Sequence, residues 1–509
     1  MKKLLCILIV TALLISSFAI SAVAENDQQY QPKSNQICDI NGDGSLNMKD
    51  VLVLRKFMAG YNIKIIYENS DLNGDCIINT KDLLLMRKAL AGMKVQLSEP
   101  FSAPSKDISD SIEDMGIMYS GEWGDYDYNK ILARNPFDMA SYNGRVYFSC
   151  GNYDSNEGPI TLQYLTRTSS RAMKSSGSLQ TEQINKFYKF DDSLFALAID
   201  PIAWLTGQYY VISGSNNRWK TRNVFTNNIH CYDMVKHNGK YYFAGSNDKT
   251  MISEEWGDER EHSVGAVFSY DPVKNEKFSN ASSYYNTVPF IDKNGDEIKY
   301  TSTGVPRVYE LVEFKGTLYA YYYDYVYDAF GKEYPEFYPT DKDPSGIYEY
   351  NDELNRFEYR ADLTIKQAFD GEGFRKDGDA VMRDFEWDDD YVVVNGKIFL
   401  TKDLKTWKTA DVKGYDDYVF TDVLTIGEKL CFSAYKQNSD GSYTNVVLES
   451  DDLVNFRELF RFNTKSWVRS FEYCDGAFFF GVGTSYSKAK EGAEESKECG
   501  RAYRYCYYN

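Results

Sequence analysis

Six oxygen-bearing positions within one twelve-residue stretch form the clearest chemical pattern in the chain. They occupy positions 1, 3, 5, 7, 9 and 12 of the stretch and are Asp39, Asn41, Asp43, Ser45, Asn47 and Asp50. Position 7 contributes its main-chain carbonyl, and the other oxygens converge as such a loop curls. A hard cation that takes about six to eight oxygen ligands is served by this alternation, so the stretch predicts a calcium loop.

The same pattern returns thirty-two residues later. Its members are Asp71, Asn73, Asp75, Ile77 through its carbonyl, Asn79 and Asp82. The register continues beyond the loops, because Leu54-Arg55-Lys56 is answered by Met86-Arg87-Lys88. Two copies in register across a whole loop and helix argue against a polar turn that arose by chance. We therefore expect two calcium ions, each held by a loop that precedes one helix.

Residues 37–97 resemble a type I dockerin, the module that attaches enzymes to the cohesins of cellulosome scaffolds. Each half lacks the first helix of an ordinary EF-hand, and position 12 is Asp where EF-hands usually have Glu. The resemblance implies that a cohesin contacts loop positions 10 and 11 and a basic pair in the following helix. These residues are Met48, Lys49, Arg55, Lys56, Thr80, Lys81, Arg87 and Lys88. Because the pairs at positions 10 and 11 differ between the halves, an exchange of roles between the halves stays open.

One residue of the second loop departs from the first. Cys76 stands where the first loop has Gly44, at a sharp turn that favours glycine. We therefore expect the second site to be weaker or distorted. We also expect calcium removal to unfold residues 37–97 and to leave the rest of the chain intact, since the acidic loops converge only around a cation.

The first 24 residues have the features of a secretory signal peptide. Lys2 and Lys3 precede an apolar run, and Ala22-Val23-Ala24 supplies a small-residue cleavage pattern, so the mature chain should begin at Glu25. A retained anchor is the alternative, although the run is short for a membrane span of about 20 residues. The formal charge of −18 becomes −20 without the two lysines, which disfavours nucleic acid and anionic membrane as partners. We expect an exported protein with no membrane span in the mature chain.

The chain beyond residue 97 divides into a short segment and a long repetitive region. Residues 98–114 are rich in Ser, Pro and Asp, and we interpret them as a linker. Residues 115–509 contain seven copies of a unit in which a turn separates aromatic strands. The copies begin at Asn135, Gln183, His230, Arg307, Arg383, Tyr418 and Arg469. Four short antiparallel strands per copy are typical of a propeller blade, so we predict a mostly β protein: a seven-bladed β-propeller after a small α dockerin domain with two calcium loop-helix repeats.

The last copy lacks its fourth strand, and the apolar stretch 115–123 could supply that strand and close the ring. The turns at Thr401–Trp407 and Ser450–Phe456 resemble those of propeller glycosidases and sialidase-like proteins, a likeness that concerns fold before function. Eight cysteines remain outside the signal peptide, and Cys499 and Cys506 are the pair that we expect to form a disulfide.

The aligned starts of the copies predict a ring of polar side chains around the central funnel. The expected substrate-binding members are Asn135, Arg307, Arg383 and Arg469. Guanidinium groups match planar oxyanions, so such a ring would attract a carboxylate or a sulfate. The alternative is structural: each arginine pairs with an acid three residues on or in the next blade, and the candidate acids are Glu310, Glu386 and Glu472.

A hydrolytic site would need two carboxylates, one of them kept protonated by burial. The candidates lie at strand ends or in the loops of the same mouth and are Asp154, Asp200, Asp233 and Glu310. Elimination from a uronate is a second possibility, in which an arginine neutralises the carboxylate and His230 or a tyrosine moves the proton. The chain has only three histidines, so a multi-histidine metal centre is disfavoured.

These patterns predict a secreted cellulosome component that binds a scaffoldin cohesin and carries a propeller directed at polysaccharide. The propeller is expected to be a glycoside hydrolase or a uronate lyase. The alternative is a non-catalytic glycan-binding or structural module, whose exposed aromatic side chains would stack on sugar rings.

Overall fold

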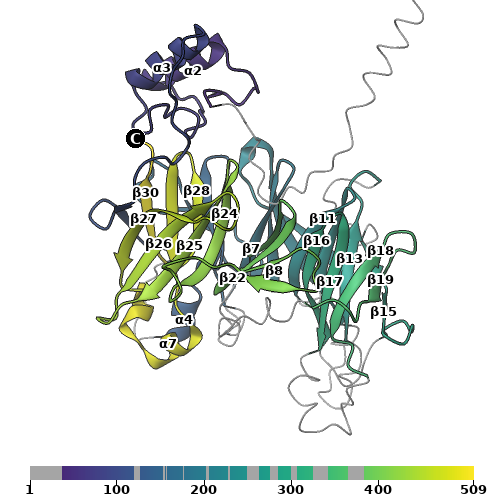
Figure 1. Ribbon diagram of the computed structural model, residues 1–509. Coiled ribbons are helices and arrows are strands. Elements are labelled where there is room, and N and C mark those ends of the chain that lie inside the picture. The colour runs from purple at the N-terminus through teal and green to yellow at the C-terminus, as the bar shows by residue number, and fades with distance from the viewer. Residues whose placement is uncertain are drawn as a thin grey trace, which may run out of the picture.

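The computed structural model describes residues 37–119, 127–152, 155, 158–175, 177–201, 206–226, 230–248, 263–274, 285–299, 306–324, 342–364 and 383–509. The expected signal peptide, residues 1–24, lies outside these ranges. Within them, two N-terminal helices precede seven β-sheets that are arranged in a ring (Figure 1). No helix in this part of the chain is both long and apolar enough to cross a bilayer.

The first four blades follow one another along the chain, and each is an antiparallel meander whose first strand is innermost. Blade one is β3 (Met139–Tyr142), β4 (Arg145–Phe148), β5 (Gln163–Leu165) and β6 (Met173–Lys174). Blade two is β7 (Thr181–Phe190), β8 (Ser193–Pro201), β9 (Thr206–Ser213) and β10 (Lys220–Thr226). Blade three is β11 (Cys231–His237), β12 (Lys240–Asp248), β13 (Ser263–Tyr270) and β14 (Tyr285–Val288). Blade four is β16 (Pro306–Phe314), β17 (Thr317–Asp324), β18 (Gly346–Asn351) and β19 (Arg356–Tyr359), with β15 (Phe290–Ile291) added parallel to β19.

The last three blades complete the ring. Blade five is β20 (Arg383–Trp387), β21 (Asp390–Asn395), β22 (Lys397–Thr401) and β23 (Trp407–Thr409). Blade six is β24 (Val419–Ile426), β25 (Lys429–Gln437), β26 (Tyr443–Ser450) and β27 (Arg457–Thr464). Blade seven is β28 (Val468–Cys474), β29 (Ala477–Val482) and β30 (Arg501–Cys506), and its outer strand is β2 (Glu113–Ile117).

The ring closes by the route that the sequence predicts. Strand β2 precedes blade one in the chain but pairs antiparallel with β30, so the last sheet combines both ends of the propeller. The inner strand β28 also contacts β3 of the first blade. The observed strand begins two residues before the predicted stretch 115–123, and residues 120–126 lie outside the described ranges. A seven-bladed propeller with a spliced last blade is therefore confirmed.

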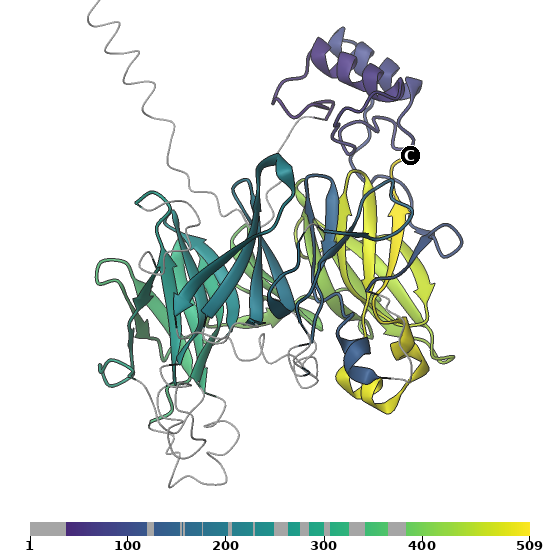
Figure 2. The same cartoon turned by 180° about the vertical axis from the view of Figure 1, so that it is seen from behind.

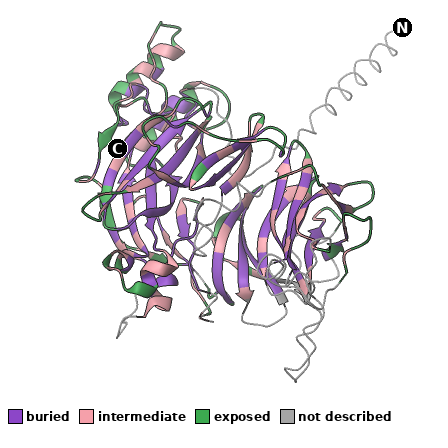
Figure 3. Cartoon of the chain, turned by 60° about the horizontal axis from the view of Figure 1, so that its bottom comes forward, coloured by how far each residue is buried: buried purple, intermediate pink, exposed green. Residues whose placement is uncertain are grey.

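Tight turns between the first two strands of several blades explain why the repeat is visible in the sequence. Two consecutive residues with positive φ occupy each of these turns, as mirror-image hairpin turns require. The pairs are Asn143-Gly144, Asn238-Gly239, Lys315-Gly316 and Asp475-Gly476. The largest fully buried side chains are almost all tyrosines, which fill the spaces between blades, and Figure 3 shows the strands coloured mostly as buried. All eight described cysteines are free, so the expected pairing of Cys499 with Cys506 is wrong.

The dockerin region contains helices α2 (Met48–Met58) and α3 (Thr80–Leu90). Asn47 and Asn79 begin these helices as N-caps, and each cap is completed by the aspartate three residues on. Both helices lie beyond the end of the ring at which the C-terminus is found, whereas α4 (Tyr128–Leu132) and α7 (Tyr486–Glu491) lie at the opposite end (Figures 1 and 2). The short 3-10 helices are η2 (Gly214–Asn216) and η5 (Glu494–Glu498).

The segment expected to be a linker lies against the propeller. Phe101 is 2% exposed within a cluster of propeller residues, and β1 (Lys106–Asp107) pairs parallel with β27. The Arg457 guanidinium also donates to the Ala103 carbonyl at 2.9 Å. The sequence predicts a linker here, because the segment is rich in Ser, Pro and Asp and has no apolar periodicity. Phe101 and Ile108 are nevertheless enough to anchor it, since both are buried.

Candidate functional site

The two predicted calcium loops have the same internal hydrogen bonds. In the first loop, Asp39 accepts the N–H groups of Gly42 and Gly44 at 2.9 and 2.8 Å. In the second, Asp71 accepts the N–H groups of Gly74 and Cys76 at 3.0 and 2.9 Å. The aspartate at position 12 accepts the N–H of position 2 in both loops, at 3.0 and 2.9 Å. Each chain segment is thus curled so that the aspartates at positions 1 and 12 are buried within the loop, as a cation site requires.

The donor set of each loop fits a hard cation. It consists of oxygens only, from Asp, Asn and main-chain groups, which is the chemistry that calcium prefers. Within the described residues, no group of three or more His, Cys, Asp or Glu side chains is positioned to hold a metal by itself. A bound ion would therefore depend on the Asn and carbonyl oxygens as well. Lys49 and Lys81 lie 3.1 and 3.0 Å from the carboxylates of Asp43 and Asp75, and calcium would compete with these exposed ion pairs.

Cys76 takes the backbone conformation that glycine takes in the first loop. Its φ is 61°, against 78° for Gly44, and its N–H makes the same bond to position 1 of its loop. The expected distortion of the second loop is therefore absent from its described backbone. The side chain of Cys76 is 8% exposed, because it is covered by the propeller. Burial raises the pKa of this thiol.

The residues expected to meet a cohesin lie on the open surface of the two helices. Met48 is 67% exposed, and Lys49, Arg55 and Lys56 are also exposed. In the second half, Thr80, Lys81 and Arg87 are exposed and Lys88 is half-buried. The residues that the resemblance assigns to cohesin binding thus form two similar surfaces, one on each helix, and both are accessible beside the propeller.

A lysine that sequence reasoning missed stands at the centre of the propeller. Lys186 on β7 lies 3.5 Å from Asp233, 3.4 Å from Glu310 and 3.3 Å from Asp384. These carboxylates come from the inner strands of the next three blades. Burial opposes the charge of Lys186, but the three acids outweigh this effect and raise its pKa. Two predicted catalytic residues, Asp233 and Glu310, are thus brought together around a cation.

Arg383 joins two blades that lie on either side of the ring closure. Its Nη2 lies 2.8 Å from Asp138 of blade one, and its Nε lies 2.7 Å from Asp422 of blade six. Asp138 and Asp422 also accept main-chain N–H groups of the following inner strands, from Phe187 at 2.6 Å and Phe471 at 3.0 Å. Arg383 therefore has a bridging role, as in the sequence alternative, but its partners are Asp138 and Asp422 and not the expected Glu310, Glu386 or Glu472. A cavity of about 70 Å³ lies beside it.

The other members of the predicted polar ring are also buried. Asn135 is fully buried, and its Oδ1 accepts from Arg469 at 3.2 Å and from the Thr484 N–H at 2.9 Å. The Arg469 guanidinium lies over the ring of Phe137, 4.6 Å from its centroid. Arg307 is 9% exposed and donates to the neighbouring Pro306 carbonyl at 2.9 Å. The three guanidinium groups therefore do not form an open rim.

Asp200 lies at the end of β8 and interacts electrostatically with Glu182, a second residue that sequence reasoning missed. Glu182 is 8% exposed, and its Oε2 has no hydrogen-bond partner within the described residues. Burial, and then the charge of Asp200, raise the pKa of Glu182 to about 7. Burial also raises the pKa of Asp200. A carboxyl group that exchanges its proton near neutral pH can serve as a general acid.

The remaining candidates do not extend this pair. His230 is half-buried before β11, with its ring 5.4 Å from that of Tyr232, and Asp154 lies outside the described residues. A larger cavity, of about 220 Å³, lies in blade four and includes Tyr322, Tyr348 and Tyr359 in its lining. In the sequence, the one sign that pointed to Glu182 is its position directly before Gln183, the aligned start of the second copy.

Comparison with known proteins identifies the N-terminal region. Residues 27–91 match the family described as Dockerin type I domain. No curated protein matches the sequence. Type I dockerin domains bind calcium, and their partners are cohesins. The protein is therefore an extracellular, cellulosome-associated component that carries a type I dockerin beside a seven-bladed β-propeller.

Proposed function

We propose that this protein docks to a scaffoldin cohesin through either of the two exposed helix surfaces and that each calcium loop holds one ion. The observation that carries the proposal is the repetition of the loop hydrogen bonds together with the exposure of Arg55, Lys56 and Arg87 from the two basic pairs. Calcium would hold each loop in the curled form and so fix the start of the helix behind it.

Calorimetry with a panel of cohesins tests this docking. Charge reversal at Arg55 and Lys56 removes one surface, and reversal at Arg87 and Lys88 removes the other. If either surface suffices, each double variant should keep binding and the quadruple variant should lose it. Loss in one double variant alone would assign binding to a single surface. Unchanged binding of the quadruple variant, or undiminished affinity in excess chelator, would refute the proposal.

We infer that the propeller acts on polysaccharide by hydrolysis, with Glu182 as general acid and Asp200 as the second carboxylate. Positions 182 and 200 lie opposite each other on the paired strands β7 and β8, between the pairs Thr181–Pro201 and Gln183–Ile199. The pKa of Glu182, raised to about 7, supports its role as the protonated acid that a hydrolase needs beside a second carboxylate. Asp233 and Glu310 are less suitable, since both face Lys186. The buried and engaged arginines also make a uronate lyase the weaker candidate.

An activity screen of the full chain tests the inference. Neutral and uronic polysaccharides should be incubated with the wild type and with Glu182→Gln, and both reducing ends and unsaturated products should be measured. Reducing ends that disappear in Glu182→Gln, but persist in the exposed-acid variant Glu353→Gln, are the expected result. Unsaturated products would favour elimination. Saturable binding without any product would support the non-catalytic alternative.

A further inference from the structure

The second calcium loop lies directly against the end of the propeller chain. The Asn509 N–H donates to the Cys76 carbonyl at 2.7 Å, and the Ile78 N–H donates to the Asn509 carbonyl at 2.8 Å. These two bonds flank Ile77, whose carbonyl is position 7 of the predicted calcium loop. The main chain that would present an oxygen to calcium is therefore held on its other side by the propeller.

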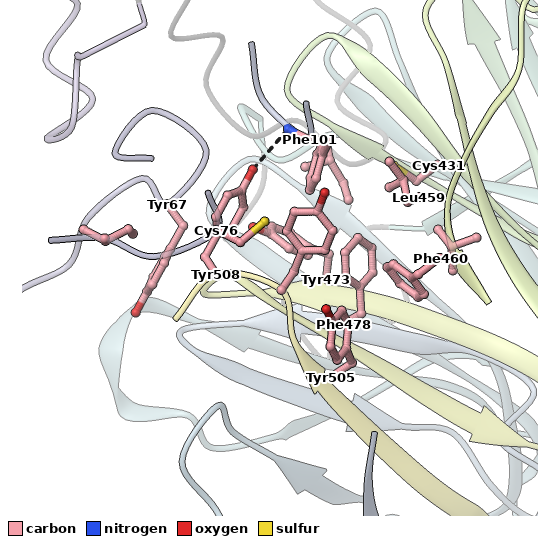
Figure 4. Packing of buried hydrophobic residues seen from close by; sticks show 14 of the residues in the cluster. Tyr67, Cys76, Phe101, Cys431, Leu459, Phe460, Tyr473, Phe478, Tyr505 and Tyr508 are labelled. Carbon is pink, nitrogen blue, oxygen red and sulfur yellow. Dashed lines mark hydrogen bonds between the residues drawn. The ribbon is translucent and has the colours of Figure 1, made fainter. Parts of the chain in front are cut away.

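An aromatic cluster surrounds this contact. We call it the interface cluster, and it consists of Phe101, Tyr473, Phe478, Tyr507 and Tyr508. The Phe101 ring lies 5.1 Å from that of Tyr507 and 5.9 Å from that of Tyr508, and its N–H donates to the Tyr508 hydroxyl at 3.3 Å. Figure 4 shows Cys76 beside the ring of Tyr508. Large apolar surfaces from the dockerin, the following segment and blade seven are thus buried together.

A cation and a glycine extend the interface. Arg167, in the loop after β5, donates to the Asp475 carbonyl at 2.6 Å and to the Tyr508 carbonyl. Its guanidinium lies over the ring of Tyr67 of the dockerin, 4.6 Å from the centroid. Tyr67 also covers Gly476, where an added Cβ would lie 2.6 Å from the tyrosine ring. The dockerin therefore contacts blade one through Arg167 and blade seven through Gly476.

The two loops differ in their surroundings at the glycine position, although their internal hydrogen bonds are the same. A Cβ added at Gly44 would meet nothing within 4 Å, whereas the equivalent Cys76 is buried in the interface. The departure from glycine in the second loop therefore coincides with the point of contact. Arg55, Lys56 and Arg87 of the basic pairs remain exposed, and Lys88 is half-buried.

We propose that the second calcium loop is an interdomain clamp, so that calcium bound there stabilises the propeller as well as the dockerin. The inference rests on the proposed calcium binding. An ion that orders Ile77 also orders the flanking groups that bond to Asn509, and through them the closing blade. By linkage, a ligand that binds only this ordered form raises the stability of everything that must be folded with it. The clamp also fixes how the cohesin surfaces are presented relative to the propeller.

Tryptophan fluorescence provides a selective readout of the propeller. All seven tryptophans of the chain follow residue 97, so none reports on the dockerin. In thermal unfolding of the full chain, we expect millimolar calcium to raise the midpoint of the tryptophan transition by about 3–6 °C. Asp75→Ala in the second loop should abolish this shift, and the matched first-loop variant Asp43→Ala should keep most of it.

A second variant separates the clamp from calcium binding itself. Cys76→Gly suits the positive φ at this position and matches Gly44, but it removes the side chain that enters the interface. It should still bind two ions in calorimetry while the tryptophan shift falls to half or less. A tryptophan midpoint that is independent of calcium in a chain that binds two ions would overturn the clamp alone. Equal shifts in Asp75→Ala and Asp43→Ala would also overturn it, and an absence of calcium binding in calorimetry would instead defeat the proposed function.

Discussion

Replacement of Arg383 by alanine should destabilise the propeller severely. The side chain is 10% exposed and contacts two carboxylates, of Asp138 at 2.8 Å and of Asp422 at 2.7 Å, whose side chains are 8% and 2% exposed. Each carboxylate also accepts a main-chain N–H, so neither can turn towards solvent without breaking a second bond. Arg383→Ala therefore leaves two buried acids without their cation.

The stability lost in Arg383→Ala depends on the distance between the charges and on whether an unpaired carboxylate can take up a proton. One pair of unit charges about 4 Å apart interacts by about 4 kcal/mol at an effective dielectric constant of about 20. Breaking a buried pair typically costs about 3–5 kcal/mol. Burial raises the pKa of Asp138 to about 6 even with Arg383 present, so an unpaired Asp138 can take up a proton and limit the loss. We expect a loss of about 3–5 kcal/mol at pH 8.

The pH dependence gives this prediction its sharpest test. A carboxyl group whose folded pKa exceeds its unfolded pKa contributes most stability at low pH and loses it as the pH rises through the folded value. Removal of the cation raises the folded pKa of Asp138 further, so the difference between Arg383→Ala and the wild type should grow from pH 5 to pH 8. Urea unfolding at both pH values measures it.

A surface arginine provides the control. Arg356 pairs with Glu358 at 2.8 Å on an outer strand, and both side chains are more than a third exposed, so Arg356→Ala should cost less than about 1 kcal/mol. If Arg383→Ala cost no more than this control, or if its cost were the same at pH 5 and pH 8, the bridging role would be refuted. Weaker binding of polygalacturonate with unchanged stability would restore the anion-recognition role.

Three further outcomes follow from other parts of the propeller. Lys186→Met leaves three carboxylates facing one another and should cost at least about 3 kcal/mol in urea unfolding at pH 8, with a smaller loss at pH 5; equal losses would contradict the central ion network. The wild type should lose stability between about pH 4.5 and pH 7 as Glu182 ionises. In Glu182→Gln, the free energy of unfolding should depend less on pH across this range and should exceed that of the wild type by about 1–3 kcal/mol at pH 8; the same pH dependence in both proteins would disprove the raised pKa. Deletion of residues 113–117 should lower the tryptophan midpoint by at least about 10 °C, because β30 loses one of its two partner strands and becomes an exposed sheet edge; a shift of a degree or two would show that ring closure matters little.

The sequence predicted well those features that depend on local order along the chain. A calcium loop is a twelve-residue pattern, and its second copy is found by counting positions. The blades are also local, because Asn143-Gly144 and Asn238-Gly239 mark hairpin turns at equal distances from the copy starts. Even the closing strand was foreseeable, since blade seven had one strand too few and an apolar stretch preceded blade one.

The centre of the propeller could not be predicted in this way. Lys186, Asp233, Glu310 and Asp384 come from four inner strands that are separated by 198 residues between the first and the last. Whether these side chains meet depends on strand register and on the bulges at Asp233 and Glu310, and a shift of one residue would reverse the facing of each strand. The sequence repeat correctly placed Arg307, Arg383 and Arg469 at the starts of inner strands, but it gave no information on whether their side chains are buried.

Cys76 illustrates how a local rule can fail for a structural reason. Within the loop, a residue other than glycine at a positive φ costs roughly 1 kcal/mol, so the sequence favoured a weakened site. The cost is real for the isolated loop, yet the same side chain is buried in one cluster with Tyr507 and Tyr508, and each buried CH2 group contributes about 0.8 kcal/mol. Burial therefore offsets much of the cost of cysteine only while the dockerin packs on the propeller. The departure from the pattern thus carries information about the partner of the loop, because it makes sense only in the assembled chain.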